Sequence, residues 1–211
     1  MLSDAQIERY SRQILLPEVG GRGQARLLAA RAAVAGSGSA ARAAATLLGR
    51  AGIGILTLSD GPGTLPELSA DCRVERTPNL AAAPVADVTV DLAGDPTETA
   101  ALGRRAQAAG KPFVLGRVSG GAVAVVTLIG RPCAACLRDG HPPGRGTSPG
   151  AGGLAPAADL ALGALAAGEA LRALLLPPGG GRRTTLALDA GTYGISPLSP
   201  TEGCALCGGT A

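Results

Sequence analysis

The sequence predicts an α/β fold with a mostly parallel sheet, an antiparallel edge and a C-terminal tail anchored by a metal ion. Three observations predict it. Strand-like apolar runs alternate with helical runs, a glycine-rich turn joins an early strand to the next helix, and two cysteine pairs stand in the C-terminal part. Alternation of strands and helices is typical of a parallel sheet covered by helices.

Composition fixes the kind of core that the chain can build. The chain has 211 residues, of which 46% are hydrophobic, but only Tyr10, Phe113 and Tyr193 are aromatic. A chain of this length can bury a sizeable core without disulfides. Alanine and leucine must therefore fill the interior, which suits close packing of helices on a sheet.

Charge and hydropathy exclude several classes of protein. The net charge is +3 and the basic residues are scattered, which argues against nucleic-acid binding. The longest apolar stretch, 154–176, is interrupted by Asp159, Glu169 and Arg172, so we expect a buried helix and no membrane span. Residues 1–12 lack the apolar core of a signal peptide. We expect a cytoplasmic protein, in which paired cysteines indicate a metal more often than a disulfide.

Capping residues, periodicity and breakers predict the elements in order. Ser3 and Gln6 have the spacing of a capping box, and the glycines at 120 and 121 between two apolar runs are typical of a hairpin. We expect helices over residues 4–15, 23–30, 40–50, 96–109 and 154–176. We expect strands over residues 32–35, 53–59, 72–75, 85–92, 113–118, 122–129 and 184–188. An exposed loop over 139–153 and an irregular tail from residue 191 complete the expected order.

A glycine-rich turn follows the strand expected at 32–35. Residues 36–41 fit the pattern G-x-G-x-x-A of a Rossmann-like fold, whose glycines allow a tight turn and the close approach of a phosphate. Free N–H groups at a helix start favour that anion, and an acid after the next strand can bind ribose hydroxyls. The candidate nucleotide-binding residues are Gly36, Ser37, Gly38, Ser39 and Asp60. The alternative is a tight turn that has lost its ligand.

Four of the five cysteines form two Cys-x-x-Cys pairs, Cys133/Cys136 and Cys204/Cys207. This spacing lets both members of a pair bind one zinc ion, and four thiolates complete a closed, structural site. The sequence therefore predicts a structural Zn²⁺ that anchors the tail. Redox dithiols and unpaired buried cysteines are the alternatives. The fifth cysteine, Cys72, is expected to be a small buried side chain.

Several short motifs are spread over most of the chain. They are residues 9–20 (RYSRQILLPEVG), 34–38 (VAGSG), 51–54 (AGIG), 58–60 (LSD), 132–137 (PCAACL), 154–156 (LAP) and 203–208 (GCALCG). Together they resemble the ThiF/MoeB/HesA family of ubiquitin-activating-type adenylyltransferases. The resemblance implies one domain over 1–211, with an N-terminal helical segment (1–30), a nucleotide-binding core (31–130) and a zinc-bearing part (131–211).

The resemblance also implies a reaction. Family members use ATP with Mg²⁺ to adenylate the C-terminal glycine of a ubiquitin-like or sulfur-carrier protein that ends in Gly-Gly, and pyrophosphate leaves. An arginine of the N-terminal segment reaches the ATP of the neighbouring subunit, and Arg12 matches that position. The resemblance therefore implies a homodimer, with the helix expected over 154–176 at its interface.

The sequence departs from the family pattern at three places. After Asp60 it lacks the family's acid, its Asn-Leu-x-Arg-Gln segment and a later lysine. The position of the magnesium-binding aspartate aligns with Gly94, and a shift by one residue would bring Asp95 there. Ser148 stands where some members carry a transfer cysteine.

Two functions therefore compete. The first is an adenylyltransferase acting on a carrier or peptide. The second is a degenerate member that binds a nucleotide or a partner as a scaffold. An NAD-dependent oxidoreductase would need a substrate domain and a proton donor, and the sequence offers neither.

Overall fold

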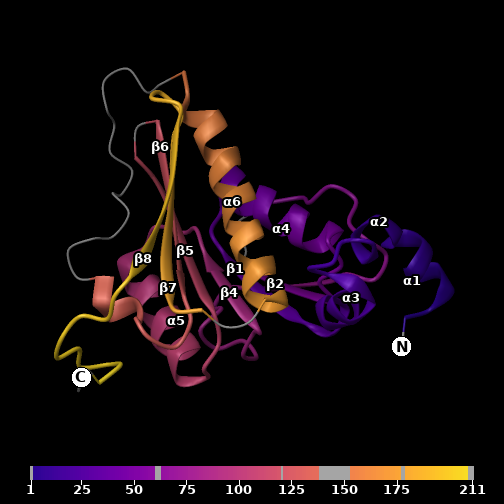
Figure 1. The fold of residues 1–211 in the computed structure, drawn as a ribbon, viewed down its shortest axis with the longest axis horizontal. Coiled ribbons are helices and arrows are strands. Elements are labelled where there is room, and N and C mark those ends of the chain that lie inside the picture. The colour runs from indigo at the N-terminus through magenta and orange to yellow at the C-terminus, as the bar shows by residue number, and fades with distance from the viewer. Residues whose placement is uncertain (1, 60–62, 120, 138–152, 177–178, 209–211) are drawn as a thin grey trace.

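The computed structural model contains an eight-stranded sheet with helices on both faces (Figure 1). It describes residues 2–59, 63–119, 121–137, 153–176 and 179–208. The helices are α1 (Asp4–Arg9), α2 (Ser11–Ile14), α3 (Gly20–Ala29), α4 (Ser39–Arg50), α5 (Pro96–Ala108), the 3-10 helix η1 (Ala134–Leu137) and α6 (Ala155–Leu175). The strands are β1 (Arg31–Ala35), β2 (Ile55–Ser59), β3 (Arg73–Thr77), β4 (Val88–Asp91), β5 (Phe113–Ser119), β6 (Ala122–Leu128), β7 (Gly181–Ala187) and β8 (Thr192–Leu198). Within the described residues, none of the helices could span a membrane.

The strand order is β3-β2-β1-β4-β5-β6-β7-β8. β1 is parallel to β2 on one side and to β4 on the other, with Ala32 opposite both Leu56 and Val88. From β5 onward the pairing is antiparallel, and Ser119 opposite Ala122 marks the predicted hairpin. The predicted α/β class, with a mostly parallel sheet and an antiparallel edge, is confirmed. Chain connections run in opposite directions from β1 and β4, and ligands of open parallel sheets bind at such a switch point.

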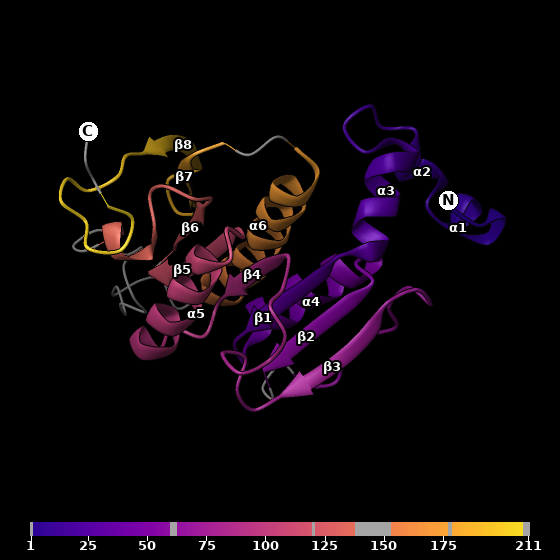
Figure 2. The same ribbon diagram turned by 90° about the horizontal axis from the view of Figure 1, so that it is seen from below.

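Small side chains allow the helices α4 and α6 to pack closely together. α4 and α6 lie together on one face of the sheet, and α5 covers the other face (Figure 2). The buried alanines Ala40, Ala44, Ala166 and Ala170 come from the two packed helices. At Gly163 a Cβ would lie 2.4 Å from the carbonyl oxygen of Ala40. The α4–α6 pair therefore packs backbone against backbone at this point, and only glycine fits there.

The three N-terminal helices form an arm that extends from the sheet (Figure 2). A single helix over 4–15 was the wrong prediction, because the helix breaks at Tyr10 (φ −104°, ψ 15°). The Tyr10 ring is buried, and its hydroxyl lies within hydrogen-bond distance of Ser69. Docking of this aromatic ring on the body of the protein turns the chain between α1 and α2. The second predicted helix starts earlier than expected, at Gly20.

The tail differs from the prediction. Residues 192–198 form β8, which pairs with β7 over its whole length, from Gly181 opposite Leu198 to Ala187 opposite Thr192. Gly191 adopts φ +62° in the connecting turn, a conformation that glycine accepts without strain. The glycines and prolines that suggested an irregular tail are accommodated because β8 is an edge strand. The loop predicted over 139–153 lies almost wholly outside the described residues.

Candidate nucleotide site and cysteine cluster

The glycine-rich turn is held between two strand ends. Gly36 has φ +127°, and a Cβ there would lie 3.0 Å from the carbonyl carbon of Leu92. The Gly36 N–H donates to the Ser59 hydroxyl at 3.0 Å, and that hydroxyl lies 3.3 Å from the Gly36 carbonyl oxygen. The first glycine of the motif is therefore required by both backbone conformation and close approach. Asp60, the predicted ribose acid that follows Ser59, lies outside the described residues.

The start of α4 has free N–H groups. Its N-cap is Gly38, which makes no side-chain cap, and the first turn carries no acidic residue. Orphan N–H groups and the helix dipole make such a start favourable for an anion. Ser37 is exposed beside it. The Ser39 hydroxyl donates to Asp159 of α6 at 3.0 Å. The structure thus brings Gly36, Ser37, Gly38 and Ser39 together with the Asp159 carboxylate, which was not among the predicted site residues.

The loop after β4 forms the other side of the switch point. Asp91 is fully buried, and its carboxylate accepts hydrogen bonds from the Ala93 N–H at 3.0 Å and from the Thr99 hydroxyl. Arg117 of β5 lies 3.4 Å from the same carboxylate and donates to Thr99 at 2.8 Å. The polar groups of Asp91 are thus engaged inside the protein. This network was not predicted, because its members lie on separate elements and have no common motif.

The two candidate magnesium positions differ in their chemistry. Gly94 has φ +84° and offers no side-chain ligand. Asp95 is the N-cap of α5, where one carboxylate oxygen accepts the Glu98 N–H at 2.7 Å. Its side chain is exposed beside the switch point. Burial, together with the charges of Asp91 and Asp95, raises the pKa of Glu98. A carboxylate oxygen of Asp95 is therefore the hard ligand that this loop presents to solvent.

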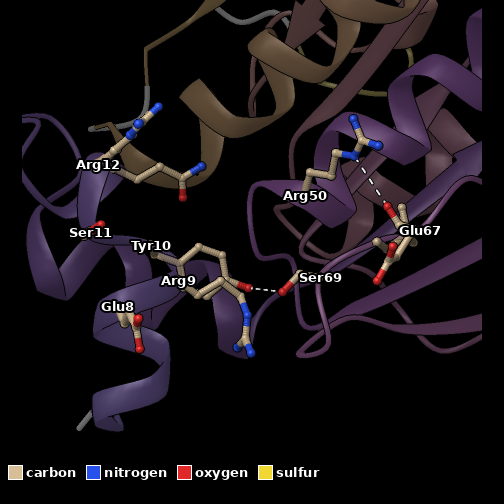
Figure 3. A pocket seen from close by; sticks show the side chains of 10 residues that line it. Glu8, Arg9, Tyr10, Ser11, Arg12, Arg50, Glu67 and Ser69 are labelled. Atoms are coloured by element: carbon tan, nitrogen blue, oxygen red, sulfur yellow. Dashed lines mark hydrogen bonds between the residues drawn. The ribbon is translucent and has the colours of Figure 1, made fainter.

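Arg12 lies far from the glycine-rich turn of its own chain. It is exposed on α2 and lines a cavity of about 520 Å³ together with Arg50, the last residue of α4 (Figure 3). The turn is at the other end of this 12-residue helix, about 18 Å away at 1.5 Å per residue. The structure therefore does not bring Arg12 to the predicted phosphate site within one chain.

The four paired cysteines converge on one point. Their Sγ atoms all lie within 4.8 Å of one another. The Sγ atoms are 3.9 Å apart in Cys133–Cys136, 3.6 Å in Cys133–Cys204 and 3.4 Å in Cys136–Cys207. Sulfurs at about 2.3 Å from a tetrahedral zinc ion would be roughly 3.8 Å apart, whereas a disulfide needs about 2.05 Å. The spacing fits a metal-binding tetrathiol and excludes a disulfide.

Chain connectivity explains this convergence. One pair follows β6 and includes part of η1, and the other pair follows β8, so the antiparallel edge brings both to the same end of the sheet (Figure 1). Cys133 and Cys204 are buried. Burial raises the pKa of Cys133, whereas backbone N–H groups of Cys207 and Leu206 lower that of Cys204. N–H groups directed at sulfur stabilise the thiolate form, which is the form that binds a metal.

Cys72 has a different environment. It is half-buried against the main hydrophobic core, and burial raises its pKa to about 11. A thiol with such a pKa is almost wholly protonated near neutral pH and is a weak nucleophile. This is consistent with the small packed side chain that was predicted. Ser148, which was aligned with a transfer cysteine, lies outside the described residues.

Comparison with known proteins gives partial sequence matches. No family model matches the chain. A segment of 59 residues is 52% identical to adenylyltransferase and sulfurtransferase MOCS3 of Mus musculus, covering 28% of this chain and 13% of that protein. A segment of the same length is 42% identical to SAMP-activating enzyme E1 of Haloferax volcanii, covering 28% of this chain and 22% of that protein. The matches thus span less than a quarter of these relatives.

Comparison with solved structures covers nearly the whole chain. E. coli MccB, in a crystal structure with ATP, superposes with a TM-score of 0.72 over 95% of this chain and 74% of that one, at 15% identity. PaaA superposes with a TM-score of 0.68 over 93% of this chain and 74% of that one, also at 15% identity. The resemblance to the ThiF/MoeB/HesA family is confirmed. The fold shared with these two structures therefore extends over nearly the whole chain.

Proposed function

We propose that this ThiF/MoeB-like chain uses ATP to adenylate the C-terminal carboxylate of a ubiquitin-like protein, a sulfur-carrier protein or a peptide. A carboxylate oxygen attacks the α-phosphorus, an acyl-adenylate forms and pyrophosphate leaves. The observation that carries the proposal is the uncapped start of α4 behind Gly36, at the switch point of the sheet. The activities named for MOCS3 and SAMP-activating enzyme E1 support a carrier as substrate.

Each candidate residue has a role in this proposal. Backbone N–H groups at Ser37, Gly38 and Ser39 hold the phosphates in this proposal. They lie at the N-terminal, positive end of the α4 dipole, where no side chain caps the helix. Asp60 binds the ribose hydroxyls. Asp95 holds Mg²⁺, which commonly uses one or two carboxylates together with substrate phosphates. When bound, the ion would neutralise charge on the leaving pyrophosphate.

Arg12 acts in a second copy of the chain in this proposal. Its distance from the turn of its own chain rules out contact within one subunit. Beside Ser39 lies a groove lined by exposed side chains of Leu47 (41%) and Leu160 (54%). The arm presents Leu15, which is 82% exposed, close to Arg12. A homodimer in which the arm of one subunit covers this groove of the other would bury these leucines and bring Arg12 to the phosphates.

We assign Zn²⁺ to the four cysteines. The tetrathiol has no open coordination position, so the ion would be structural. It would join η1 to the segment after β8 and thereby fix the C-terminal part of the sheet. Because the four sulfurs are already within 4.8 Å of one another, binding needs little rearrangement.

A scaffold function is the second candidate. It is favoured by Gly94 in place of a carboxylate and by the engagement of Asp91 with Thr99 and Arg117. A chain of this kind would bind nucleotide or a partner without turnover. The two candidates share the nucleotide site, so nucleotide binding alone does not separate them.

The deciding experiment is ATP–pyrophosphate exchange in the presence of carrier proteins that end in Gly-Gly. We expect exchange that depends on the carrier and is lost in Arg12→Ala and Asp60→Asn. ATP binding without exchange for every carrier tried would reject the adenylyltransferase in favour of the scaffold. Arg22→Ala is the matched control, because Arg22 is an exposed arginine of the same arm.

A mixing experiment tests the action of Arg12 across subunits. Arg12→Ala and Asp60→Asn are each expected to be inactive alone. Random mixed dimers would restore about one quarter of the sites, because half of the dimers are mixed and each contains one intact site. No recovery after verified subunit exchange would show that Arg12 does not act in the neighbouring subunit.

Metal analysis tests the cysteine assignment. Protein purified under reducing conditions is expected to contain one zinc ion per chain, and Cys204→Ser is expected to lose it. Cys72→Ser is the control and should keep its metal. A zinc content near zero in folded, reduced wild-type protein would reject the assignment.

A further inference from the structure

The carboxylate of Asp159 lies at the beginning of α4. Its position follows from the close packing of α6 on α4 at Gly163, where a Cβ would lie 2.4 Å from the Ala40 carbonyl oxygen. Residues four apart lie on the same face of a helix, so Asp159 faces α4 one turn before Gly163. The Ser39 hydroxyl donates to its carboxylate at 3.0 Å.

This placement has an electrostatic consequence. The first turn of α4 has no acidic residue of its own, and Gly38 provides no side-chain cap. The N-terminus of α4 is the positive end of its helix dipole, which stabilises any nearby negative charge. Asp159 supplies one from another helix. The same carboxylate repels a phosphate that approaches the turn, because two negative charges within a few ångströms destabilise each other.

No cation among the described residues forms an ion pair with the Asp159 carboxylate. Arg42 lines the same groove as Ser39 and Leu160, but no ion pair joins it to Asp159 among the described residues. Asp159 is partly exposed. It is therefore a solvent-accessible anion in contact with the first residue of the helix that would receive the nucleotide.

We propose that the Asp159 carboxylate, an anion of the protein itself, competes with nucleotide phosphate at the glycine-rich turn and thereby sets the affinity of the turn for ATP. The proposal rests on the nucleotide site proposed above. When phosphate binds, the Ser39 hydroxyl exchanges its bond to Asp159 for a bond to the ligand. The charge of Asp159 then opposes the ligand until a cation or the arginine of a second subunit offsets it.

The test compares wild-type protein with Asp159→Asn. The amide keeps the size of the side chain and an oxygen that can accept from Ser39, and it removes only the charge. We expect Asp159→Asn to bind ATP roughly tenfold more tightly at low salt in a calorimetric titration with EDTA present, with a smaller gain at high salt. Asp4→Asn carries the same change of net charge on exposed α1 and should bind like wild type. Equal or weaker ATP binding by Asp159→Asn would overturn the proposal. So would binding that weakens only when Mg²⁺ is present, since that result makes Asp159 a metal ligand.

A second probe separates this inference from the proposed function. Inorganic pyrophosphate is titrated while the backbone amide signals of Gly38 and Ser39 are followed by NMR. If neither protein binds ATP but these signals shift at lower pyrophosphate concentration in Asp159→Asn, the competing anion is supported and the ATP-dependent function is rejected. If the signals of Asp159→Asn respond no more strongly than those of wild type, the competing anion is rejected whatever the result with ATP.

Discussion

The Arg117 guanidinium lies 3.4 Å from the fully buried carboxylate of Asp91, and Thr99 hydrogen-bonds to both. The three residues come from β5, the end of β4 and the first turns of α5. Through the Ala93 N–H, Asp91 also fixes the loop that follows β4. The pair therefore holds together the elements that surround the switch point.

Replacing Arg117 by methionine should destabilise the protein. The substitution leaves a buried carboxylate without its cation, which costs about 3–5 kcal/mol in comparable buried pairs. Urea unfolding followed by circular dichroism measures the loss. Arg22→Met, on the exposed side of α3, is the control and should change the free energy of unfolding by less than about 0.5 kcal/mol. A similarly small change for Arg117→Met would show that Asp91 does not need its partner.

Two glycines of α6 should respond oppositely to alanine. Gly163→Ala places a methyl group 2.4 Å from a backbone oxygen of α4, whereas a Cβ at Gly168 meets nothing within 4 Å. We expect Gly163→Ala to lower stability by roughly 1–3 kcal/mol through overpacking. We expect Gly168→Ala to raise stability by roughly 0.5–1 kcal/mol, because alanine is the better helix former. Thermal unfolding of the two variants compares them directly, and a stabilised Gly163→Ala would contradict the close packing.

Glu169 should make stability depend on pH. It is buried, and burial opposes its ionisation, but the hydrogen bond from Thr127 and the charges of Arg172 and Arg182 outweigh burial and lower its pKa. A carboxylate with a lowered folded-state pKa stabilises the protein above its unfolded-state pKa of about 4.3, and this contribution is lost as the pH falls through the folded-state pKa.

Glu169→Gln should therefore be destabilised by roughly 3 kcal/mol at pH 7. The difference from wild type should shrink as the pH falls below about 4. Denaturant titrations at pH 7 and at a pH below about 4 measure this difference in the free energy of unfolding. Glu18→Gln is the exposed control. A difference that stays constant over this pH range would mean that packing, and not charge, explains the loss.

Asp71 should hold the arm in place. Its carboxylate accepts from Gln6 at 3.1 Å, from Arg9 at 2.5 Å and from the Tyr10 hydroxyl at 3.1 Å. Asp71→Ala should speed amide hydrogen exchange in α1 and α2 while leaving the central strands protected, because only the arm depends on these contacts. Glu67→Ala tests whether any acid of this segment has the same effect. Unchanged exchange in the arm would assign its docking to the Tyr10 ring alone.

The sequence predicted those parts of the fold that depend on local pattern. The glycine-rich turn, the hairpin after Ser119 and the cysteine pairs each lie within a few residues of the chain, and each is where it was expected. β8 was missed because its residues alternate only weakly and it is stabilised by pairing with β7. The turn at Gly191 was the available signal for this second hairpin.

Long-range polar contacts could not be read from the sequence. The Ser39–Asp159 bond joins residues 120 positions apart, and the Thr127–Glu169 bond joins residues 42 positions apart. No periodicity specifies such pairs, because they depend on how α6 is positioned on the sheet. The charges within the apolar stretch 154–176 were seen only as interruptions. In the structure, Glu169 and Asp159 connect α6 to the sheet and to α4.

The position of β8 gives the cysteine cluster one more consequence. β8 is the last strand in the sheet order, and Tyr193 and Ile195 on it are 59% and 54% exposed. An exposed edge strand is a template for pairing with another chain. An ion that joins Cys204 to Cys133 would restrain the end of this strand. Metal-starved protein would therefore aggregate through β8 while its distant glycine-rich turn was still intact.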